Sequence, residues 1–346
     1  MILKQADKKL IVIKNPKEIS QCDIFICEDF LDIEKLFDHF KSVGYPKLII
    51  SDCIKIYHDI GIPFIGAHTI AGRFLTDYQK IIFDNNFETK YCANIFVNKK
   101  QMNRHLTLKF ASILNISFDY IWNGINRNAD FSSILEKQQN LMSMITNDQK
   151  TKLLSPLTLS KKWIDNSYGN QDPDTVDPNI FALPHGGNHV YSWNNFCKQL
   201  MVNSAVTIIN ENPDYQNCSH LSWKTIFSIL ALTFPIWAGG YRIADELKEK
   251  GFDIFDDIID HSYQYKSTLF ERCWYAFNDN LSILSDLDRA TSLREKNKKR
   301  LLKNRQLFLN GTLYNNIVKE INDWNLPNSI KEFYIKEFLL KYNNSL

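Results

Sequence analysis

Glycine is scarce in this chain, with 12 residues in 346, and the excess of positive over negative charge is small. The 41 lysines and arginines are offset by 39 aspartates and glutamates, which leaves a net charge of +2. The overall charge therefore gives no argument for nucleic-acid binding. No apolar run approaches the roughly 20 residues that a membrane-spanning helix requires, and residues 1–9 lack the apolar core of a signal peptide.

Closely spaced cysteine pairs are also absent. The seven cysteines are spread along the chain without a C-x-x-C motif, which favours reduced thiols and a cytoplasmic location. The hydrophobic fraction of 44% and the charged fraction of 23% are ordinary for a globular protein, and the length suffices for two domains with full cores. We expect a cytoplasmic monomer that does not associate with membranes.

The stretch from residue 205 to residue 251 alternates strands and helices. Short apolar runs predict strands at 205–209 and 234–238, and helical patterns follow each of them at 223–232 and 242–250. Ser222 is a suitable N-cap for the first helix, and Gly251 is a suitable C-terminal stop for the second. This order of elements is typical of a parallel α/β sheet.

Ligands of such sheets lie beyond the carboxyl ends of the strands. Those ends carry Glu211 and the Gly239–Gly240 pair here, and Lys224 lies in the first turn of the intervening helix. A helix N-terminus and a glycine turn offer N–H groups to a diphosphate, Lys224 offers a cation, and Glu211 can accept the hydroxyl protons of a ribose. We expect Lys224 to be exposed; the alternative is an ordinary parallel sheet with a buried turn.

This stretch resembles the donor-binding half of GT-B glycosyltransferases of the α1,3-fucosyltransferase type. The counterparts of the family motif are Glu211-Asn212-Pro213, Ser222-Trp223-Lys224 and the strand Pro235–Gly239. It is similar, too, to phage and giant-virus glycosyltransferase-like proteins, whose corresponding region ends in a run like Phe252–Asp260. Trp223 stands where the fucosyltransferase motif has glutamate, so the role of that glutamate does not carry over, whereas Lys224 is retained.

The family resemblance extends to the strand predicted at Tyr91–Val97 and the basic loop and helix after it. Enzymes of this type open the donor domain with a strand, a polar loop and an arginine near the helix start. The resemblance gives that role to Arg104, with Lys99 and Lys100 beside it, in a layout suited to phosphate. The alternative for this loop is a solvated basic turn.

The first 85 residues predict a smaller α/β unit. Strands are expected at 9–14, 22–27, 47–50 and 62–65, with a helix at 33–43 and a short helix at 54–59. Glu28, Asp29, Asp52 and His68 follow strand ends. In a two-domain glycosyltransferase this edge faces the cleft, so these four are the candidates for the catalytic base, with Glu28 and Asp29 ranked first and Asp52 next. Each is also an ordinary turn or cap residue.

The segment 126–191 is expected to hold a polar helix at 131–147 and a loop rich in Pro, Asn, Asp and Gly at 165–188. Its basic and aromatic residues can clamp nucleic acid, but an ordinary packed insertion is favoured. His185 and His189 are separated by two glycines, so no metal site is assigned to them.

The C-terminal part predicts an amphipathic helix at 269–284, a basic helix at 287–308 and further helices at 313–342. A charge run of this kind is usually a solvated face. It is also the concentrated basic patch of the sequence, and Lys298, Lys299 and Arg300 are the candidates for contact with a DNA backbone.

The sequence thus predicts an α/β fold of GT-B-like architecture, in which two Rossmann-like domains face a cleft and helices follow. The expected units are an acceptor-side domain at 1–90, a donor domain at 91–285 and a helical segment at 286–346. The expected enzyme transfers a hexosyl or pentosyl group from a nucleotide-sugar, UDP-linked, to a hydroxyl by inverting displacement without metal or other cofactor.

The expected acceptor is 5-hydroxymethylcytosine in double-stranded phage DNA, with an arabinosyl or glucosyl donor. A stand-alone cytoplasmic enzyme with a basic helix suits that substrate. Two alternatives stay open: a glycosyltransferase that acts on a glycan, and a non-catalytic DNA- or nucleotide-binding α/β protein.

Overall fold

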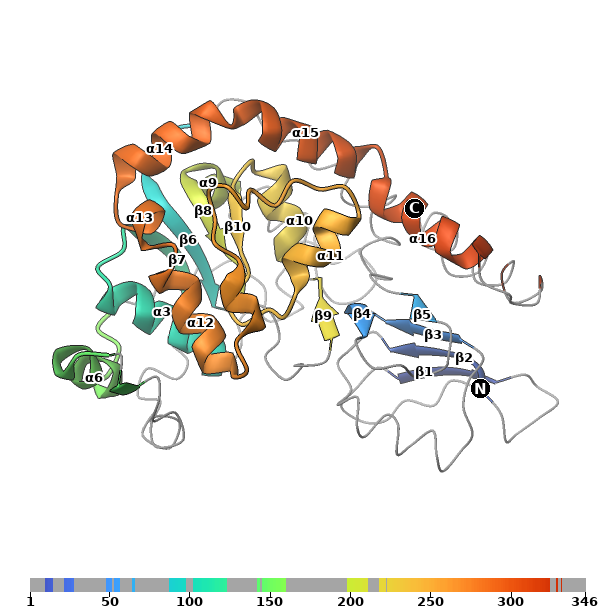
Figure 1. Cartoon of the computed structure of the whole chain (residues 1–346), viewed down its shortest axis with the longest axis horizontal. Coiled ribbons are helices and arrows are strands. Elements are labelled where there is room, and N and C mark those ends of the chain that lie inside the picture. Colours follow the sequence, from blue (N-terminus) through green and yellow to red (C-terminus); the bar gives the residue numbers. More distant parts are fainter. Residues whose placement is uncertain are drawn as a thin grey trace, which may run out of the picture.

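The chain forms a mixed α/β structure around a parallel four-stranded sheet (Figure 1). The computed structural model describes residues 10–14, 22–27, 48–51, 53–56, 64–65, 87–97, 102–122, 142–143, 145–159, 198–210, 218–221, 223–323, 328 and 331. The predicted helices at 33–43 and 131–147 lie wholly or largely outside these residues.

The parallel sheet has the strand order β10-β8-β6-β7. Its strands are β6 (Tyr91–Val97), β7 (Phe118–Trp122), β8 (Ser204–Ile208) and β10 (Phe234–Ile236). All three neighbouring pairs are parallel, which confirms the predicted parallel sheet. The chain moves from β6 outward to β7, then returns to the other side of β6 to form β8 and β10. The direction of winding therefore reverses between β6 and β8.

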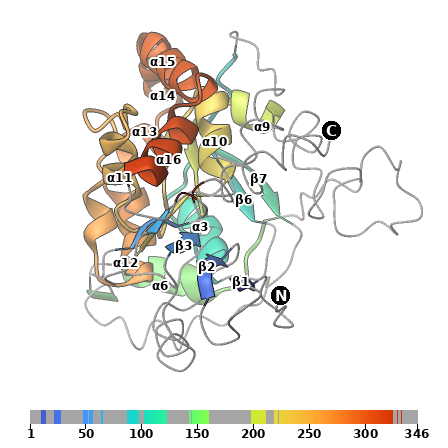
Figure 2. The same cartoon turned by 90° about the vertical axis from the view of Figure 1, so that its right-hand side faces the viewer.

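Helices cover both faces of this sheet. Crossovers between parallel strands are right-handed, so α3 (Met102–Ile113) and α10 (Trp223–Leu230), which follow strands on opposite sides of the reversal, lie on opposite faces. α3 packs against α12 (Leu269–Asn278), where Phe110 meets the rings of Phe270 and Trp274 edge-on. α10 packs against α15 (Lys298–Leu309), and Figure 2 shows α14 and α15 above it.

Two predicted helices are each divided in the structure. The helix expected at 287–308 consists of α14 (Leu287–Lys296) and α15, separated at Asn297. The helix expected at 269–284 consists of α12 and the short α13 (Leu281–Leu284). Between them, the amide of Asn280 accepts from the main-chain nitrogen of Asp260 at 2.8 Å and donates to its oxygen at 3.0 Å. These breaks let the C-terminal helices bend along the sheet domain (Figure 1).

Arg294 of α14 binds together the amino ends of three parallel strands. Its guanidinium donates to the main-chain oxygens of Val202, Ala231 and Leu232 at 2.6–2.9 Å, and to the Thr89 hydroxyl at 3.2 Å. The side chain is fully buried, and its charged carbon lies 3.7 Å from the ring centre of Phe87. One residue of the predicted basic patch is therefore an internal structural element.

The shorter elements complete the described helices. They are α6 (Asn147–Leu154), α9 (Lys198–Val202), α11 (Ile243–Glu249), the 3₁₀ helix η4 (Ser262–Tyr265) and α16 (Thr312–Asp323). The sequence reading missed α6 and α9. α6 begins with a capping box, in which Thr146 and Gln149 satisfy each other's main-chain N–H groups.

The N-terminal strands form a second four-stranded sheet in the order β1-β2-β3-β5. Its strands are β1 (Leu10–Lys14), β2 (Cys22–Cys27), β3 (Leu48–Ser51) and β5 (Phe64–Ile65). β2, β3 and β5 are parallel, but β1 is antiparallel to β2. The sheet is therefore mixed, in contrast to the purely parallel sheet β10-β8-β6-β7.

A two-stranded ladder joins the N-terminal part to the parallel-sheet domain. β4 (Cys53–Ile56) pairs antiparallel with β9 (Cys218–His220), between the two sheets in Figure 1. The prediction of a short helix at 54–59 was wrong for residues 54–56, because they belong to a strand whose partner lies far along the chain; residues 57–59 lie outside the described part of the chain. β9 was not predicted at all.

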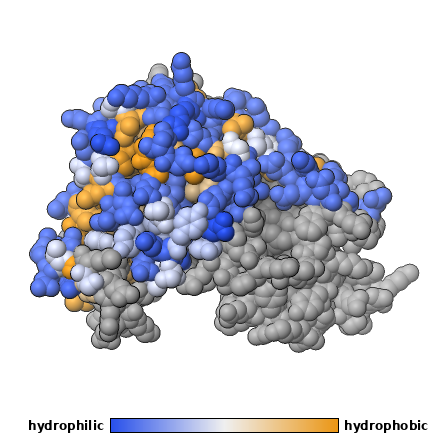
Figure 3. Space-filling model, viewed as in Figure 1, coloured by the Kyte–Doolittle hydropathy of each residue, from blue (hydrophilic) through white to orange (hydrophobic). Residues whose placement is uncertain are grey.

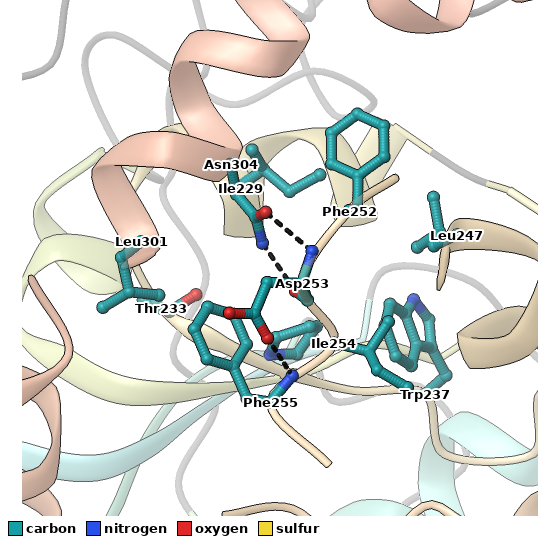
Figure 4. A pocket seen from close by; sticks show the side chains of 11 residues that line it. Ile229, Thr233, Trp237, Leu247, Phe252, Asp253, Ile254, Phe255, Leu301 and Asn304 are labelled. Carbon is teal, nitrogen blue, oxygen red and sulfur yellow. Dashed lines mark hydrogen bonds between the residues drawn. The ribbon is translucent and has the colours of Figure 1, made fainter. Parts of the chain in front are cut away.

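The segment 252–257 is fixed to α15 by side chains. The amide of Asn304 accepts from the main-chain nitrogen of Asp253 at 2.9 Å and donates to its oxygen at 2.6 Å, as a neighbouring strand would (Figure 4). The Asp253 carboxylate accepts from the nitrogen of Phe255, whose φ of 60° is unusual for a bulky residue. Arg300, also in α15, forms salt bridges with Asp253 and Asp257.

Candidate functional site

The reversal between β6 and β8 is where a sheet of this kind binds ligands. Asn210 follows β8 at its carboxyl end and is fully buried. Its side-chain nitrogen lies 3.4 Å from the main-chain oxygen of Phe96 in β6, so one residue spans the two strands at the reversal. Lys224 of α10 donates from Nζ to the main-chain oxygen of Asn210 at 3.2 Å. The structure therefore places the predicted cation at the reversal.

Lys224 is buried, with 3% of its surface exposed, so the expectation that it is exposed was wrong. α10 carries no acidic residue in its first turn. Next to Lys224, the Thr225 hydroxyl accepts from the indole nitrogen of Trp237 at 2.9 Å, and Trp237 is completely buried beyond β10. This packing ties the start of α10 to the end of β10, so the lysine is held in place by the core.

α3 brings a second cation to the same edge of the sheet. Arg104 lies in the first turn of α3, the helix that follows the carboxyl end of β6, and is 5% exposed. Its main-chain oxygen accepts from the Thr107 hydroxyl at 2.8 Å. The first turn of α3 contains no acidic residue, so the positive end of the helix dipole adds to the charge of Arg104.

His105, adjacent to Arg104, is 1% exposed. Burial, together with the nearby charge of Lys109, lowers the pKa of the imidazole to about 4. His105 is therefore neutral at physiological pH and adds no charge to this edge. Sequence reasoning did not single it out, because a histidine inside a helix shows no pattern of its own.

The glycine turn beyond β10 is tightly packed. Gly239 has φ +82°, and a Cβ there would lie 2.6 Å from Leu269; at Gly240 a Cβ would lie 2.6 Å from Ile243. The positive φ favours glycine at position 239, whereas at Gly240 a Cβ would require the end of the Ile243 side chain to move and would lie 3.0 Å from Trp237. The N–H of Gly240 donates to the main-chain oxygen of Trp237 at 2.9 Å, which corrects the expectation that both glycines offer N–H groups to a phosphate.

Arg272 is the buried cation that sequence reasoning missed. It lies in α12, 1% exposed, and its Nε donates to the main-chain oxygen of Gly239 at 3.0 Å. Its Nη1 donates to the oxygens of Lys266 and Ser267 at 3.0 and 3.4 Å. The helical periodicity of 269–284 placed Arg272 on an amphipathic helix without indicating that the glycine turn needs a donor.

The remaining predicted site residues lie outside the described part of the chain. They are Glu28, Asp29, Asp52, His68, Lys99, Lys100, Glu211 and Ser222. The strands next to three of them are described: Cys27 is paired with Ser51 at the carboxyl ends of β2 and β3. Cys53, on the other side of Asp52, pairs with His220, four positions before Lys224. The ladder thus joins the strand ends of the first sheet to the segment before α10.

The predicted DNA-binding residues differ in their surroundings. Arg300 makes forked hydrogen bonds at 2.6–2.9 Å to both Asp253 and Asp257, which raise its pKa. Lys298 is partly buried, with its ammonium 5.2 Å from the ring centre of Phe87. Lys299 is exposed, as are Lys296 and Lys303, on a largely hydrophilic surface along α15 (Figure 3).

Comparison of the chain with protein-family models, with curated proteins and with solved structures gives no match. Within the described ranges, no helix is both long and apolar enough to cross a lipid bilayer. In the same ranges, no group of three or more His, Cys, Asp or Glu side chains is arranged to hold a metal ion.

Proposed function

We propose that the protein is a GT-B glycosyltransferase that transfers a sugar from a nucleotide-sugar to a hydroxyl. The contact of Lys224 with Asn210 carries the proposal, because it puts a buried cation at the winding reversal of a parallel sheet. Arg104 enters the same edge from α3. Two buried cations at two helix starts suit a ligand with two phosphates better than a neutral one.

In this proposal the donor diphosphate contacts Lys224 and Arg104, and Glu211, one residue beyond Asn210, accepts from the ribose hydroxyls. A carboxylate from the N-terminal part removes the proton of the acceptor hydroxyl. The acceptor oxygen then forms a bond to the anomeric carbon while the bond from that carbon to the diphosphate oxygen breaks, with inversion. The cations stabilise the charge of the leaving diphosphate, which is the larger contribution expected; general-base assistance is typically worth ~10²–10⁴ in rate.

Among the proposed bases we now place Asp52 ahead of Glu28 and Asp29, on the grounds of the strands that flank it. The residues on either side of it, Ser51 and Cys53, belong to β3 and β4. β4 pairs with β9, in the segment that leads to Lys224. A carboxylate at this position comes from the acceptor-side sheet and is linked through a β-ladder to the donor-side sheet. Glu28 and Asp29 follow β2, the neighbouring parallel strand, and are the next candidates.

For the acceptor, we propose hydroxymethylated cytosine in double-stranded DNA, contacted by the exposed lysines of α14 and α15. Lys299 and Lys303 are four residues apart on α15, so they lie on the same side of that helix, and Lys296 is the last residue of α14. A row of exposed lysines is suited to a phosphate backbone. Arg300 does not contact the DNA in this proposal, because its guanidinium forms salt bridges with Asp253 and Asp257.

The experiment is a transfer assay with the full chain, a panel of UDP- and other nucleotide-linked sugars, and hydroxymethylated or unmodified duplex DNA. Release of nucleoside diphosphate together with a sugar on the hydroxymethylated duplex supports the whole proposal. Transfer only to a glycan or to water supports a glycosyltransferase that uses a nucleotide-sugar donor, but not DNA as the acceptor. Nucleotide binding without turnover in any combination would instead favour a non-catalytic nucleotide-binding protein.

A further inference from the structure

Arg272 carries a buried positive charge that forms no salt bridge with the carboxylates of the described residues. Three of its contacts are hydrogen bonds to main-chain oxygens of Gly239, Lys266 and Ser267. The remaining nitrogen, Nη2, is buried and has no hydrogen-bond partner. A buried charge that is neither paired nor fully hydrogen-bonded lowers the stability of the fold. An anion that accepted a hydrogen bond from Nη2 would remove this cost.

Arg294 shows what a purely structural arginine looks like in the same protein. It is equally buried, but Nε, Nη1 and Nη2 all donate to main-chain or hydroxyl oxygens. It lies at the amino edge of the sheet, away from the proposed donor site. Arg272, in contrast, contacts the turn at the carboxyl end of β10 and leaves one arm of its guanidinium unused. The difference between the two arginines points to a ligand at Arg272.

We infer that Arg272 and the turn 239–241 form an anion-binding site for a phosphate group. The identity of the anion as the donor diphosphate rests on the proposed function; the site itself rests on the buried guanidinium. The planar fork of arginine suits two phosphate oxygens, and Nη2 is the donor that remains. Gly239 keeps the turn free of a side chain where it meets Leu269 and Cys273 of α12.

The ring of Tyr241 lies beside this guanidinium. The charged carbon of Arg272 lies 6.0 Å from the centre of the Tyr241 ring, and the tyrosine is partly exposed. Nη2 itself is not exposed, so an anion reaches it only after the side chains around Arg272 rearrange. In the present position the Tyr241 ring lowers the cost of the unpaired charge through a cation–π contact.

The test is a titration of the full chain with inorganic pyrophosphate, followed by calorimetry and by the shift of the melting temperature. Arg272→Gln should weaken pyrophosphate binding at least tenfold, and Arg272→Lys should weaken it less, since the charge remains. Arg242→Gln is the matched control: this neighbouring cation is already paired with Asp245 at 3.0 Å, so its loss should change the affinity less than twofold. Equal affinity in the Arg272→Gln variant and the wild type overturns the inference.

A second measurement uses the wild-type protein, so its result does not depend on whether the variants fold. Hydrogen–deuterium exchange with and without pyrophosphate should show added protection in peptides that cover residues 239–242 and 266–273. Absence of protection in both peptides at saturating pyrophosphate overturns the inference, as does absence of binding.

The two proposals fail in different ways. If pyrophosphate binds through Arg272 but no nucleotide-sugar is bound or turned over, the anion site stands and the glycosyltransferase proposal falls. If nucleotide-sugar is turned over with an unchanged KM by Arg272→Gln, the enzyme proposal stands and Arg272 has no part in donor binding.

Discussion

Lys224 and Asn210 are joined by a hydrogen bond of 3.2 Å from the ammonium to the main-chain oxygen. One residue begins a helix and the other ends a strand, and they meet at the reversal of a parallel sheet. A cation in this position has two effects: it satisfies a strand-end carbonyl in the free protein, and it provides charge for an anion at the ligand edge.

Lys224→Met should reduce both stability and nucleotide affinity. The substitution keeps the volume of a side chain that is 3% exposed but leaves a buried carbonyl unsatisfied, at a cost of ~1–3 kcal/mol. Loss of a charged hydrogen bond of about 1.5–3 kcal/mol should weaken UDP binding by roughly 10- to 100-fold. Chemical denaturation and calorimetry measure the two effects.

Lys109→Met is the control for this substitution. Lys109 is 2% exposed in α3 and donates to the main-chain oxygen of Lys152 at 3.4 Å. Its loss should lower stability in the same way without changing UDP affinity. If the two variants lose UDP affinity equally, the effect of Lys224→Met comes from the lower stability of the domain and not from a lost contact with UDP.

Arg294→Met should be among the most destabilising single changes in the chain. It leaves buried main-chain carbonyls before β8 and β10 without their hydrogen-bond donor, and each costs ~1–3 kcal/mol. We therefore expect the free energy of unfolding to fall by at least about 3 kcal/mol. Arg289→Met, on the exposed side of the same helix, should change stability by no more than about 0.5 kcal/mol. Similar denaturation midpoints for the two variants would contradict the role given to Arg294.

His105 should make the protein sensitive to mild acid. Its pKa in the folded state is about 4, below the usual 6.5 of an unfolded histidine, so the unfolded chain takes up the proton first. This contribution to stability is complete above about pH 6.5 and is lost as the pH falls toward 4, by up to ~3 kcal/mol. His105→Gln should therefore flatten the pH dependence of the denaturation midpoint between pH 6.5 and 4. An unchanged profile would show that another group causes the acid sensitivity.

Several features of the fold could be predicted from local sequence, and several could not. The strand at Tyr91–Val97 and the helix that begins at Trp223 follow from apolar periodicity and a strand–helix–strand order, because these signals lie within the segments themselves. β4 could not be recognised, since its partner β9 lies far along the chain. Arg272, Arg294 and Arg300 look alike in a helical charge pattern; only the positions of the carbonyls and carboxylates they contact distinguish them.

If DNA is the acceptor, binding should weaken with added salt, with a log–log slope of about −0.9 for each phosphate neutralised. Lys299→Glu combined with Lys303→Glu should flatten that slope without unfolding the protein, because both side chains are exposed. Arg300→Glu should instead destabilise the fold, since it places a third acid beside Asp253 and Asp257. Salt-independent binding, or no binding at low salt, would count against a DNA acceptor.

The most direct measurement is a crystal structure of the full chain with UDP bound. The account predicts that the diphosphate lies at the carboxyl edge of the parallel sheet, with oxygens within hydrogen-bond distance of Lys224 Nζ and Arg104. A diphosphate bound elsewhere, with no contact to Lys224 or Arg104, would contradict the assignment of this edge as the donor site.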